Sequence, residues 1–343
     1  MQLNQVQIPD RVRNLASVMT SPLGRIRSLL SNAAEHYRNV LRSSPNAINY
    51  LQGRGIGGAV AARYGLGYST AAWHGLRSIL TRYGESTIHL SGLVVAKGQG
   101  AVTHRFDRFR GRVMFPIRTR DGFIVGFGGR TINQTDAKYI NSPEGVMFQK
   151  RDLLYGLYEA QHAIRCEGSA LVVEGYFDVL MLAQAGYNPV VGTLGTACTR
   201  SQIASLLSLT RKVIFCFDGD EAGRCAAERA LQNVLPSATN DHSFHFVFLP
   251  ERHDPDSFVR ANGIEQFKVA LAGAMSLIDF IKEQITVNCD LRYAEGRSRC
   301  ASQAQQLWKT LPDGEVRDNL LTHCASLIDI PPIEMRSMWE EAC

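Results

Sequence analysis

Three apolar runs of strand length, each followed by acidic residues, occupy the middle of the chain. They are Leu171–Val173 before Glu174, Val213–Phe217 before Asp218 and Asp220, and Phe246–Leu249 before Asp254 and Asp256. Apolar runs of this length between turn residues are typical of strands buried in a parallel sheet. In open α/β sheets, ligands bind at the edge where the carboxyl ends of the strands lie. The three runs therefore predict one sheet edge with three acidic clusters, an arrangement suited to a divalent metal.

Strand and helix patterns alternate from residue 170 to residue 270. The expected strands are 170–173, 190–193, 212–217 and 245–249, and the expected helices are 176–185, 199–209, 221–235 and 257–261. Strands that alternate with helices of this length give a parallel sheet with right-handed crossovers. The fold class is therefore α/β around a central parallel-sheet domain.

The segments on either side of this alternation have other patterns, which give four expected segments. They are a partly ordered extension at 1–27, an N-terminal mixed α/β basic subdomain at 28–164, the parallel-sheet domain at 165–272, and a C-terminal helical bundle at 273–343. In the bundle, helical patterns without strand-like runs are interrupted at 312–314 and 331–332. Such a pattern is typical of packed helices.

In the N-terminal subdomain, helical spacing predicts a helix over 28–42, with Ser31 as a candidate cap. Shorter helices are expected at 47–51, 58–64 and 76–83, and another at 152–164. Residues 112–118 and 123–127 predict a β-hairpin around Asp121-Gly122, in which Pro116 favours an edge position or a bulge. Residues 138–143 are expected to form a polar loop.

Composition excludes several classes of protein. Of the 343 residues, 45% are hydrophobic and 20% are charged, as in ordinary soluble domains. No apolar run approaches the roughly 20 residues that span a bilayer, and the N-terminus lacks a secretion signal, so we expect a cytoplasmic location and no membrane partner. The cysteines are scattered, without the spacing of zinc ligands, and predict neither a zinc site nor disulfides.

The net charge of +5 is mild, but the charge is unevenly distributed. Basic side chains outnumber acidic ones between residues 101 and 151, whereas acidic ones are in excess from 165 to 260. Lys150 and Arg151 stand just before the expected helix at 152–164, where positive charge opposes the helix dipole unless an anion is bound. A basic segment beside an acidic one favours a polyanion groove next to a metal site, although a single charge run is usually a solvated face.

Carboxylates at i and i+2, as in Asp218-x-Asp220 and Asp254-x-Asp256, can turn toward one ion. Mg²⁺ and Mn²⁺ prefer oxygen ligands and retain several waters, so a few carboxylates hold them near a phosphate. Glu174 could join them as a ligand or act as an acid or base. Each acid alone could instead cap a helix, and Asp256 is a candidate for the helix after it. We expect a shared metal site because three caps at equivalent strand ends are improbable together.

Two short motifs carry a resemblance to a known superfamily. The stretch Glu174 to Asp178, followed by Asp218-x-Asp220, resembles the TOPRIM domain of topoisomerases, primases and related nucleases. Flanking motifs narrow the resemblance to the RNA-polymerase core of bacterial DnaG-type primases, and they lie at 113–118, 126–130, 138–143, 154–160, 217–224 and 254–259. The resemblance is strong from Ala47 to Phe267 and weaker through the helical tail.

The resemblance implies template-directed synthesis of short RNA primers from ribonucleoside triphosphates on single-stranded DNA, with an RNA–DNA hybrid as product and Mg²⁺ or Mn²⁺ as cofactor. Carried over by motif, the catalytic residues are Glu174, Asp218 and Asp220, and the metal ligands are these three together with Asp178, Asp254 and Asp256. The resemblance also implies nucleotide binding by Lys138, Asn141 and Lys150, and DNA binding by Arg54, Arg110, Arg112 and Arg130. Cations of this kind bind the phosphate backbone without reading sequence.

The chain also departs from the family pattern. DnaG-type primases begin with a zinc-binding domain and end with a helicase-binding domain, and we expect both to be missing here. The chain would then be an excised core or a compact protein of a mobile element, and Met1 favours the second. A zinc module could come from a separate primase subunit, and a replicative helicase remains an open partner.

Two other functions use the same residues. A TOPRIM nuclease would cut nucleic acid with these acids, and a non-catalytic adaptor would only bind DNA. The primase-like flanking motifs disfavour the nuclease, and retention of all the acids disfavours the adaptor.

Overall fold

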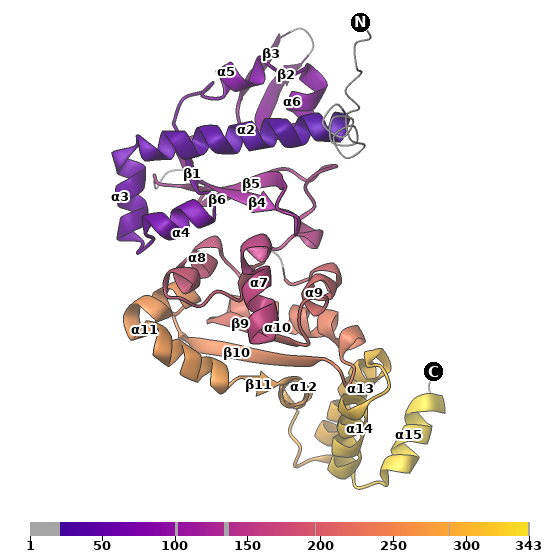
Figure 1. Cartoon of the computed structure of the whole chain (residues 1–343). Coiled ribbons are helices and arrows are strands. Elements are labelled where there is room, and N and C mark those ends of the chain that lie inside the picture. The colour runs from indigo at the N-terminus through magenta and orange to yellow at the C-terminus, as the bar shows by residue number, and fades with distance from the viewer. Residues whose placement is uncertain (1–20, 100–101, 134–136, 196, 288, 342–343) are drawn as a thin grey trace, which may run out of the picture. The chain divides into compact units, whose positions relative to one another are not determined.

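The computed structural model describes residues 21–99, 102–133, 137–195, 197–287 and 289–341. The chain forms two compact units, of which the first ends at Glu159 and the second begins at Ala160 (Figure 1). The expected extension at 1–27 lies mostly outside the described residues, so only its last part can be compared.

The first long helix, α2 (Pro22–Arg42), begins earlier than expected. The prediction of a start at residue 28 with Ser31 as cap is wrong, because the Ser21 hydroxyl caps the helix by accepting from the Gly24 N–H at 3.0 Å. Pro22 occupies the first turn, where a missing N–H costs no hydrogen bond. The helix buries one face, from Ile26 to Tyr37, against the core of this unit.

A four-stranded antiparallel sheet packs against α2. It consists of β1 (Gly67–Ser69), β4 (Arg112–Arg118), β5 (Ile124–Thr131) and β6 (Tyr139–Asn141), in the order β1-β4-β5-β6. The predicted hairpin is confirmed, and Gly122 has the positive φ of 87° that its turn requires. Pro116 lies beyond the stretch of β4 that pairs with β1, and a bulge follows at Ile117, so its missing N–H is tolerated.

Smaller elements complete the first unit. They are α3 (Pro45–Gly53), α4 (Gly58–Arg63), α5 (Arg77–Leu80), α6 (Glu85–Ser91), β2 (Val94–Gln99) and β3 (Val102–Asp107). The paired strands β2 and β3 were not expected, nor was β6, which occupies part of the predicted loop at 138–143. The helix expected at 76–83 is only one turn long.

The helix α7 (Leu157–Glu167) starts later than the predicted residue 152. A short 3₁₀ turn, Lys150–Asp152, comes first, and Gly156 then takes a φ of 80° that breaks the helical path. Lys150 and Arg151 therefore do not stand at the start of α7. Their charges therefore do not oppose the dipole of α7, and the argument for a bound anion from that dipole does not apply.

The second unit contains the predicted parallel sheet. Its strands are β7 (Ser169–Val173), β8 (Val190–Gly192), β9 (Lys212–Gly219), β10 (Ser243–Glu251) and the short β11 (Met275–Ser276), in the order β11-β10-β9-β7-β8. All pairings are parallel except that of β11, which was not predicted. The expected α/β fold is thus confirmed, and β9 lies between β7 and β10.

Helices cover both faces of this sheet. They are α8 (Tyr176–Gln184), α9 (Arg200–Leu207), α10 (Glu221–Val234) and α11 (Pro255–Ala272). Right-handed crossovers put α8 on one face and α9 and α10 on the other, and α11 packs against α8. The predicted helix at 257–261 is much longer, since helical hydrogen bonding resumes after a break at Gly263, where φ is 80°.

The C-terminal helices are α12 (Leu277–Thr286), α13 (Ala294–Thr310), α14 (Glu315–Ile328) and α15 (Pro332–Glu341). Phe280 of α12 packs on Phe246 of β10, with ring centroids 4.5 Å apart. The rings of Trp308 and Trp339 meet edge to face at 5.4 Å and join α13 to α15. Across the described ranges, no helix is both long and apolar enough to cross a membrane.

Candidate metal centre

The order of the strands brings the three acidic clusters to one sheet edge. Because β7, β9 and β10 are parallel neighbours, the residues after each strand lie side by side. The Gly219 N–H donates to the His253 carbonyl at 3.1 Å. A Cβ atom on Gly219 would lie only 2.1 Å from the Pro250 carbonyl oxygen. Glycine between Asp218 and Asp220 therefore lets the ends of β9 and β10 approach closely.

Glu174 and Asp218 carry the least satisfied carboxylates of this edge. Among the described residues, Glu174 Oε1 and Asp218 Oδ1 are buried without a hydrogen-bond partner. Burial, followed by the charge of Asp220, raises the pKa of Glu174, whereas the Asp218 backbone N–H acts in the opposite direction. Burial, followed by neighbouring carboxylates, raises the pKa of Asp218 to about 8. Within the described residues, neither carboxylate forms the ion pair that an ionised buried acid requires.

Asp178 and Asp256 lie deeper and are held by the protein itself. Asp178 Oδ2 accepts from the Gly175 N–H at 2.8 Å, and its Oδ1 accepts from the Asp256 N–H at 3.2 Å. Burial and then the charge of Asp254 raise the pKa of Asp178 to about 7. The Asp256 carboxylate pairs with Arg260 Nε at 3.0 Å. These two acids tie the loop after β7 to the start of α11.

Asp220 and Asp254 are helix caps. Asp220 Oδ1 accepts from the Gly223 N–H at 2.8 Å at the start of α10, and Asp254 Oδ1 accepts from the Ser257 N–H at 2.7 Å at the start of α11. Two of the three acidic clusters thus supply a helix cap, whereas Glu174 of the first cluster does not. The expectation of Asp256 as the cap of its helix is wrong, because Asp254 caps α11. A cap occupies one carboxylate oxygen, so capping and metal binding are compatible.

A divalent cation fits this donor set. Within the described ranges, no three His, Cys, Asp or Glu side chains already have the arrangement of a metal site. Glu174 and Asp218 nevertheless present unpartnered oxygens in a cluster of mutually repelling carboxylates. Hard cations prefer such oxygen donors, and binding one would offset both the burial and the repulsion. The residues therefore suit Mg²⁺ or Mn²⁺.

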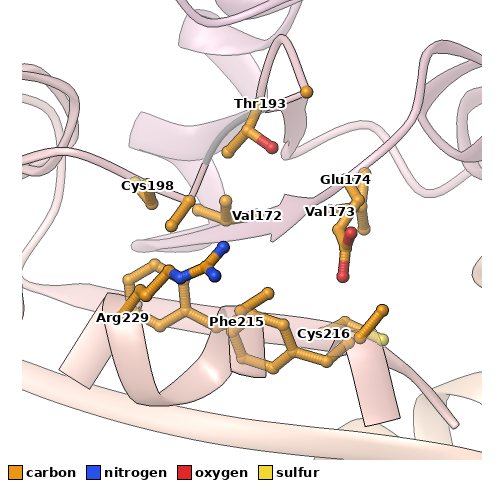
Figure 2. A pocket seen from close by; sticks show the side chains of 13 residues that line it. Val172, Val173, Glu174, Thr193, Cys198, Phe215, Cys216 and Arg229 are labelled. Atoms are coloured by element: carbon orange, nitrogen blue, oxygen red, sulfur yellow. The ribbon is translucent and has the colours of Figure 1, made fainter. Parts of the chain in front are cut away.

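A cavity of about 240 Å³ borders Glu174 on the face of the sheet that α10 covers. Figure 2 shows the Glu174 carboxylate pointing into it, with Phe215 along its wall and Arg229 of α10 toward the other end. Sequence reasoning gave Arg229 no role, because it lies inside a helix and outside every recognised motif. Only the packing of α10 on β9 brings it to this cavity.

The arginines expected to bind DNA have different surroundings in the first unit. Arg112 is buried, and its Nη1 donates to the carbonyls of Gly129 at 3.3 Å and Ala137 at 2.8 Å. Arg130 is half-buried and donates to two tyrosine hydroxyls. The remaining two are Arg110, whose guanidinium lies 3.8 Å from the centre of the Trp73 ring, and Arg54, half-buried at the end of α3.

The expected nucleotide-binding residues also belong to the first unit. Lys138 is exposed just before β6, whereas Asn141 is half-buried within β6 and pairs with Gly128 of β5. Lys150 is half-buried in the 3₁₀ turn, and its backbone N–H donates to the Glu144 carboxylate at 3.3 Å. The sheet and the turn thus hold these three residues within one unit.

Three protein-family models match successive parts of the chain. They are a DNA primase catalytic core N-terminal domain at 36–161, a Toprim-like domain at 171–259, and a DnaB-helicase binding domain of primase at 278–332. The third match makes the expected absence of a helicase-binding segment wrong. Its helices α12 to α14 carry an ordinary amphipathic pattern, which gave no distinctive motif in the sequence.

Full-length relatives are similar over most of this chain. It is 39% identical to the DNA primase of Pseudomonas putida over 92% of its length, and 41% identical to that of Escherichia coli K12 over 79%. These alignments cover 48% and 47% of the respective primases, so the chain spans about half the length of the curated relatives it matches.

Solved structures are similar over nearly their whole length. A DNA primase domain from Pseudomonas aeruginosa has a TM-score of 0.86 and 39% identity, and the match covers 92% of this chain and 99% of that domain. A DnaG primase catalytic domain bound to single-stranded DNA has a TM-score of 0.85 and 36% identity, with 91% and 99% covered. The similarity therefore includes both compact units.

Proposed function

This chain belongs to the family of DnaG-type primase catalytic cores, and we propose that it synthesises short RNA primers from ribonucleoside triphosphates on a single-stranded DNA template. The observation that carries the proposal is the pair of unpartnered carboxylate oxygens of Glu174 and Asp218 at the edge of the parallel sheet, within the described residues. The same proposal includes the division of the chain into the four segments expected from the sequence, with 165–272 as the catalytic TOPRIM domain.

In this proposal, Glu174, Asp218 and Asp220 hold one or two divalent cations and are the catalytic acids. Bound there, Mg²⁺ or Mn²⁺ would stabilise the charge that develops on the transferred phosphoryl group. Asp178, Asp254 and Asp256 support the site by fixing the loops around it, as their backbone hydrogen bonds indicate. The capping acids Asp220 and Asp254 thus serve both a helix start and the metal site.

Nucleotide and template are proposed to bind through the cations of the first unit. Lys138 and Lys150, with Asn141, would contact the triphosphate or the nucleic-acid backbone. Arg54, Arg110 and Arg130 would guide the template through backbone phosphates, which carry no sequence information. Arg112 supports this surface from within, because its guanidinium is engaged with two backbone carbonyls.

We propose two protein partners. The match at 278–332 supports docking of a replicative helicase on α12 to α14. A zinc-binding primase subunit acting in trans remains our hypothesis for selection of the start site. Equally efficient initiation by this chain with and without a candidate zinc-domain partner would refute that hypothesis.

One assay separates primer synthesis from the two alternatives. The protein is incubated with single-stranded DNA, labelled ribonucleotides and Mg²⁺ or Mn²⁺, beside Asp218→Asn. We expect short RNA that depends on Asp218. Template cleavage that depends on Asp218 would identify a nuclease, and binding without any product in either protein would identify an adaptor.

A further inference from the structure

Arg252 adopts a backbone conformation that arginine rarely takes. Its φ is 67°, and the only other non-glycine residue with positive φ in the described part of the chain is Asp329. Arg252 is the third residue of a turn that the His253 N–H closes by donating to the Pro250 carbonyl at 3.1 Å. Turns with positive φ at this position normally place glycine there. Arginine at this position costs folding free energy that glycine would not.

The surrounding backbone fixes this turn. The Gly219 N–H donates to the His253 carbonyl at 3.1 Å, and the Pro250 carbonyl lies where a Gly219 Cβ would be. Asp254, two residues after Arg252, caps α11. The turn therefore cannot relax to suit its side chain. An arginine in this strained conformation points to a use for its guanidinium.

Arg252 borders the acidic site. Arg252 lines an open depression of about 600 Å³ together with Asp218, Asp220 and Arg224. Arg224 is engaged there: its Nη1 pairs with the Glu283 carboxylate at 2.8 Å, and its guanidinium lies 4.4 Å from the centre of the Phe248 ring. Arg252 is exposed, and within the described ranges its side chain has no hydrogen bond or ion pair.

We propose that Arg252 binds the terminal phosphates of the incoming ribonucleoside triphosphate, the part that leaves as pyrophosphate. This inference rests on the proposed primer synthesis, and it adds a phosphate-binding residue to the acids. A guanidinium makes paired, charge-assisted hydrogen bonds to phosphate oxygens. Since carboxylates also line the depression, a polyphosphate can enter only with a divalent cation. The contribution of Arg252 therefore appears only when that cation is present.

The test compares Arg252→Gly, Arg252→Gln and Arg252→Lys with wild type in the full chain. Binding of a fluorescent ATP analogue is measured with and without Mg²⁺, and unlabelled tripolyphosphate is the competitor. We expect Gly and Gln to weaken Mg²⁺-dependent binding of both probes by about tenfold and Lys by less, because one charge-assisted contact is lost. Affinity for single-stranded DNA should stay within about twofold, since a template contact would weaken it instead.

Stability provides the second readout, with Asp329→Gly as the matched control. Both glycine variants remove a strained positive φ, so both should raise the melting temperature, but only Arg252→Gly should weaken triphosphate binding. Unchanged tripolyphosphate binding in Arg252→Gly and Arg252→Gln, or equal weakening in Asp329→Gly, would overturn the inference. If wild type makes no primers, the proposed function fails, while the binding measurement still decides the role of Arg252.

Discussion

Glu174 and Asp218 differ from the other acids of the site in what neutralises them. Asp178 and Asp254 accept backbone N–H groups, and Asp256 pairs with Arg260. Glu174 and Asp218 each keep a buried oxygen without a partner in the described structure, and burial raises the pKa of both. A buried carboxylate without compensation costs folding free energy. The protein carries this cost where a cation would remove it.

Asp218→Asn should raise the melting temperature of metal-free protein at neutral and higher pH, because burial and neighbouring carboxylates make ionisation of Asp218 more costly in the folded than in the unfolded state. It should also abolish stabilisation by metal, which for wild type reaches about 2.7 kcal/mol at 100 times the dissociation constant. Thermal unfolding with EDTA and with Mn²⁺ measures both effects. Equal stabilisation of the two proteins by Mn²⁺ would show that Asp218 is not a ligand.

The sequence identified these acids but not their local roles. Apolar runs and Asp-x-Asp spacing predicted which residues gather at the sheet edge. The same pattern could not show that Asp220 and Asp254 cap helices, because a cap depends on where the helix starts. It also gave no sign of Arg252, whose interest comes from its backbone conformation.

At the scale of elements, helix boundaries were the least predictable feature. The apolar period of α2 was recognised, but its start at Pro22 was missed because the first turn carries fewer buried residues. The positive φ of Gly156 moves the start of α7 to a later residue than predicted. The strand β6 occupies part of the predicted polar loop, because pairing with β5 supplies its hydrogen bonds. Tertiary contacts decided these cases and left no local pattern in the sequence.

Capping and catalysis by Asp220 can be separated with two substitutions. Serine is as good a cap as aspartate, so Asp220→Ser should keep the free energy of unfolding, whereas Asp220→Ala should lose about 1 kcal/mol. Both should lose metal-dependent RNA synthesis. Thr199→Ala, which removes the cap of α9, is the control. It should lose about as much stability as Asp220→Ala but keep RNA synthesis. Full activity in Asp220→Ser would restrict Asp220 to capping.

A buried ion pair joins β4 to the start of α7. Arg118 and Glu159 pair with 14% and 5% of their side chains exposed. Arg118→Met should destabilise the protein by about 3–5 kcal/mol, because it leaves a buried charge unpaired, and adding Glu159→Leu should recover much of this. Urea unfolding of the single and double variants measures the coupling. A double variant as unstable as Arg118→Met would contradict it.

The same pair predicts a dependence on pH. Burial raises the pKa of Glu159, and the charge of Arg118 opposes this. An acid whose pKa is higher in the folded state binds more protons there, so stability falls as pH rises above the unfolded value of about 4.3. Arg118→Met removes the opposing charge, so its stability should fall more steeply with pH than that of wild type. Parallel pH profiles would contradict this.

At the scale of the whole molecule, the parallel sheet and its three acidic strand ends were predicted correctly. The repeated strand–helix alternation made this possible, because each unit of the pattern repeats the same physical signal. The strands of the first unit were only partly predicted, since β1 and β6 have three residues each and β2 and β3 form a separate two-stranded sheet. The helicase-binding segment was missed because amphipathic helices look alike whatever they bind.

DNA binding should distinguish the two neighbouring arginines. For single-stranded DNA, Arg110→Ala should reduce the slope of the logarithm of the binding constant against the logarithm of the salt concentration by about one. The free energy of unfolding should stay nearly unchanged. Arg112→Ala should instead cost about 1–3 kcal/mol of unfolding free energy, because two backbone carbonyls lose their donor. Binding titrations at several salt concentrations, with urea unfolding, compare them. A change of slope without loss of stability in Arg112→Ala would place it on the DNA surface.

The most direct test of the central claim is the rate of RNA synthesis on a template of defined sequence as Mg²⁺ is varied. Wild type and the remote control Asp329→Asn should make RNA complementary to the template at similar rates. RNA synthesis by Glu174→Gln should be at least about 100-fold slower than by wild type at every Mg²⁺ concentration. A melting curve checks that this variant is folded. If Glu174→Gln follows the wild-type curve, the carboxylates of this sheet edge do not hold the metal that makes the primer.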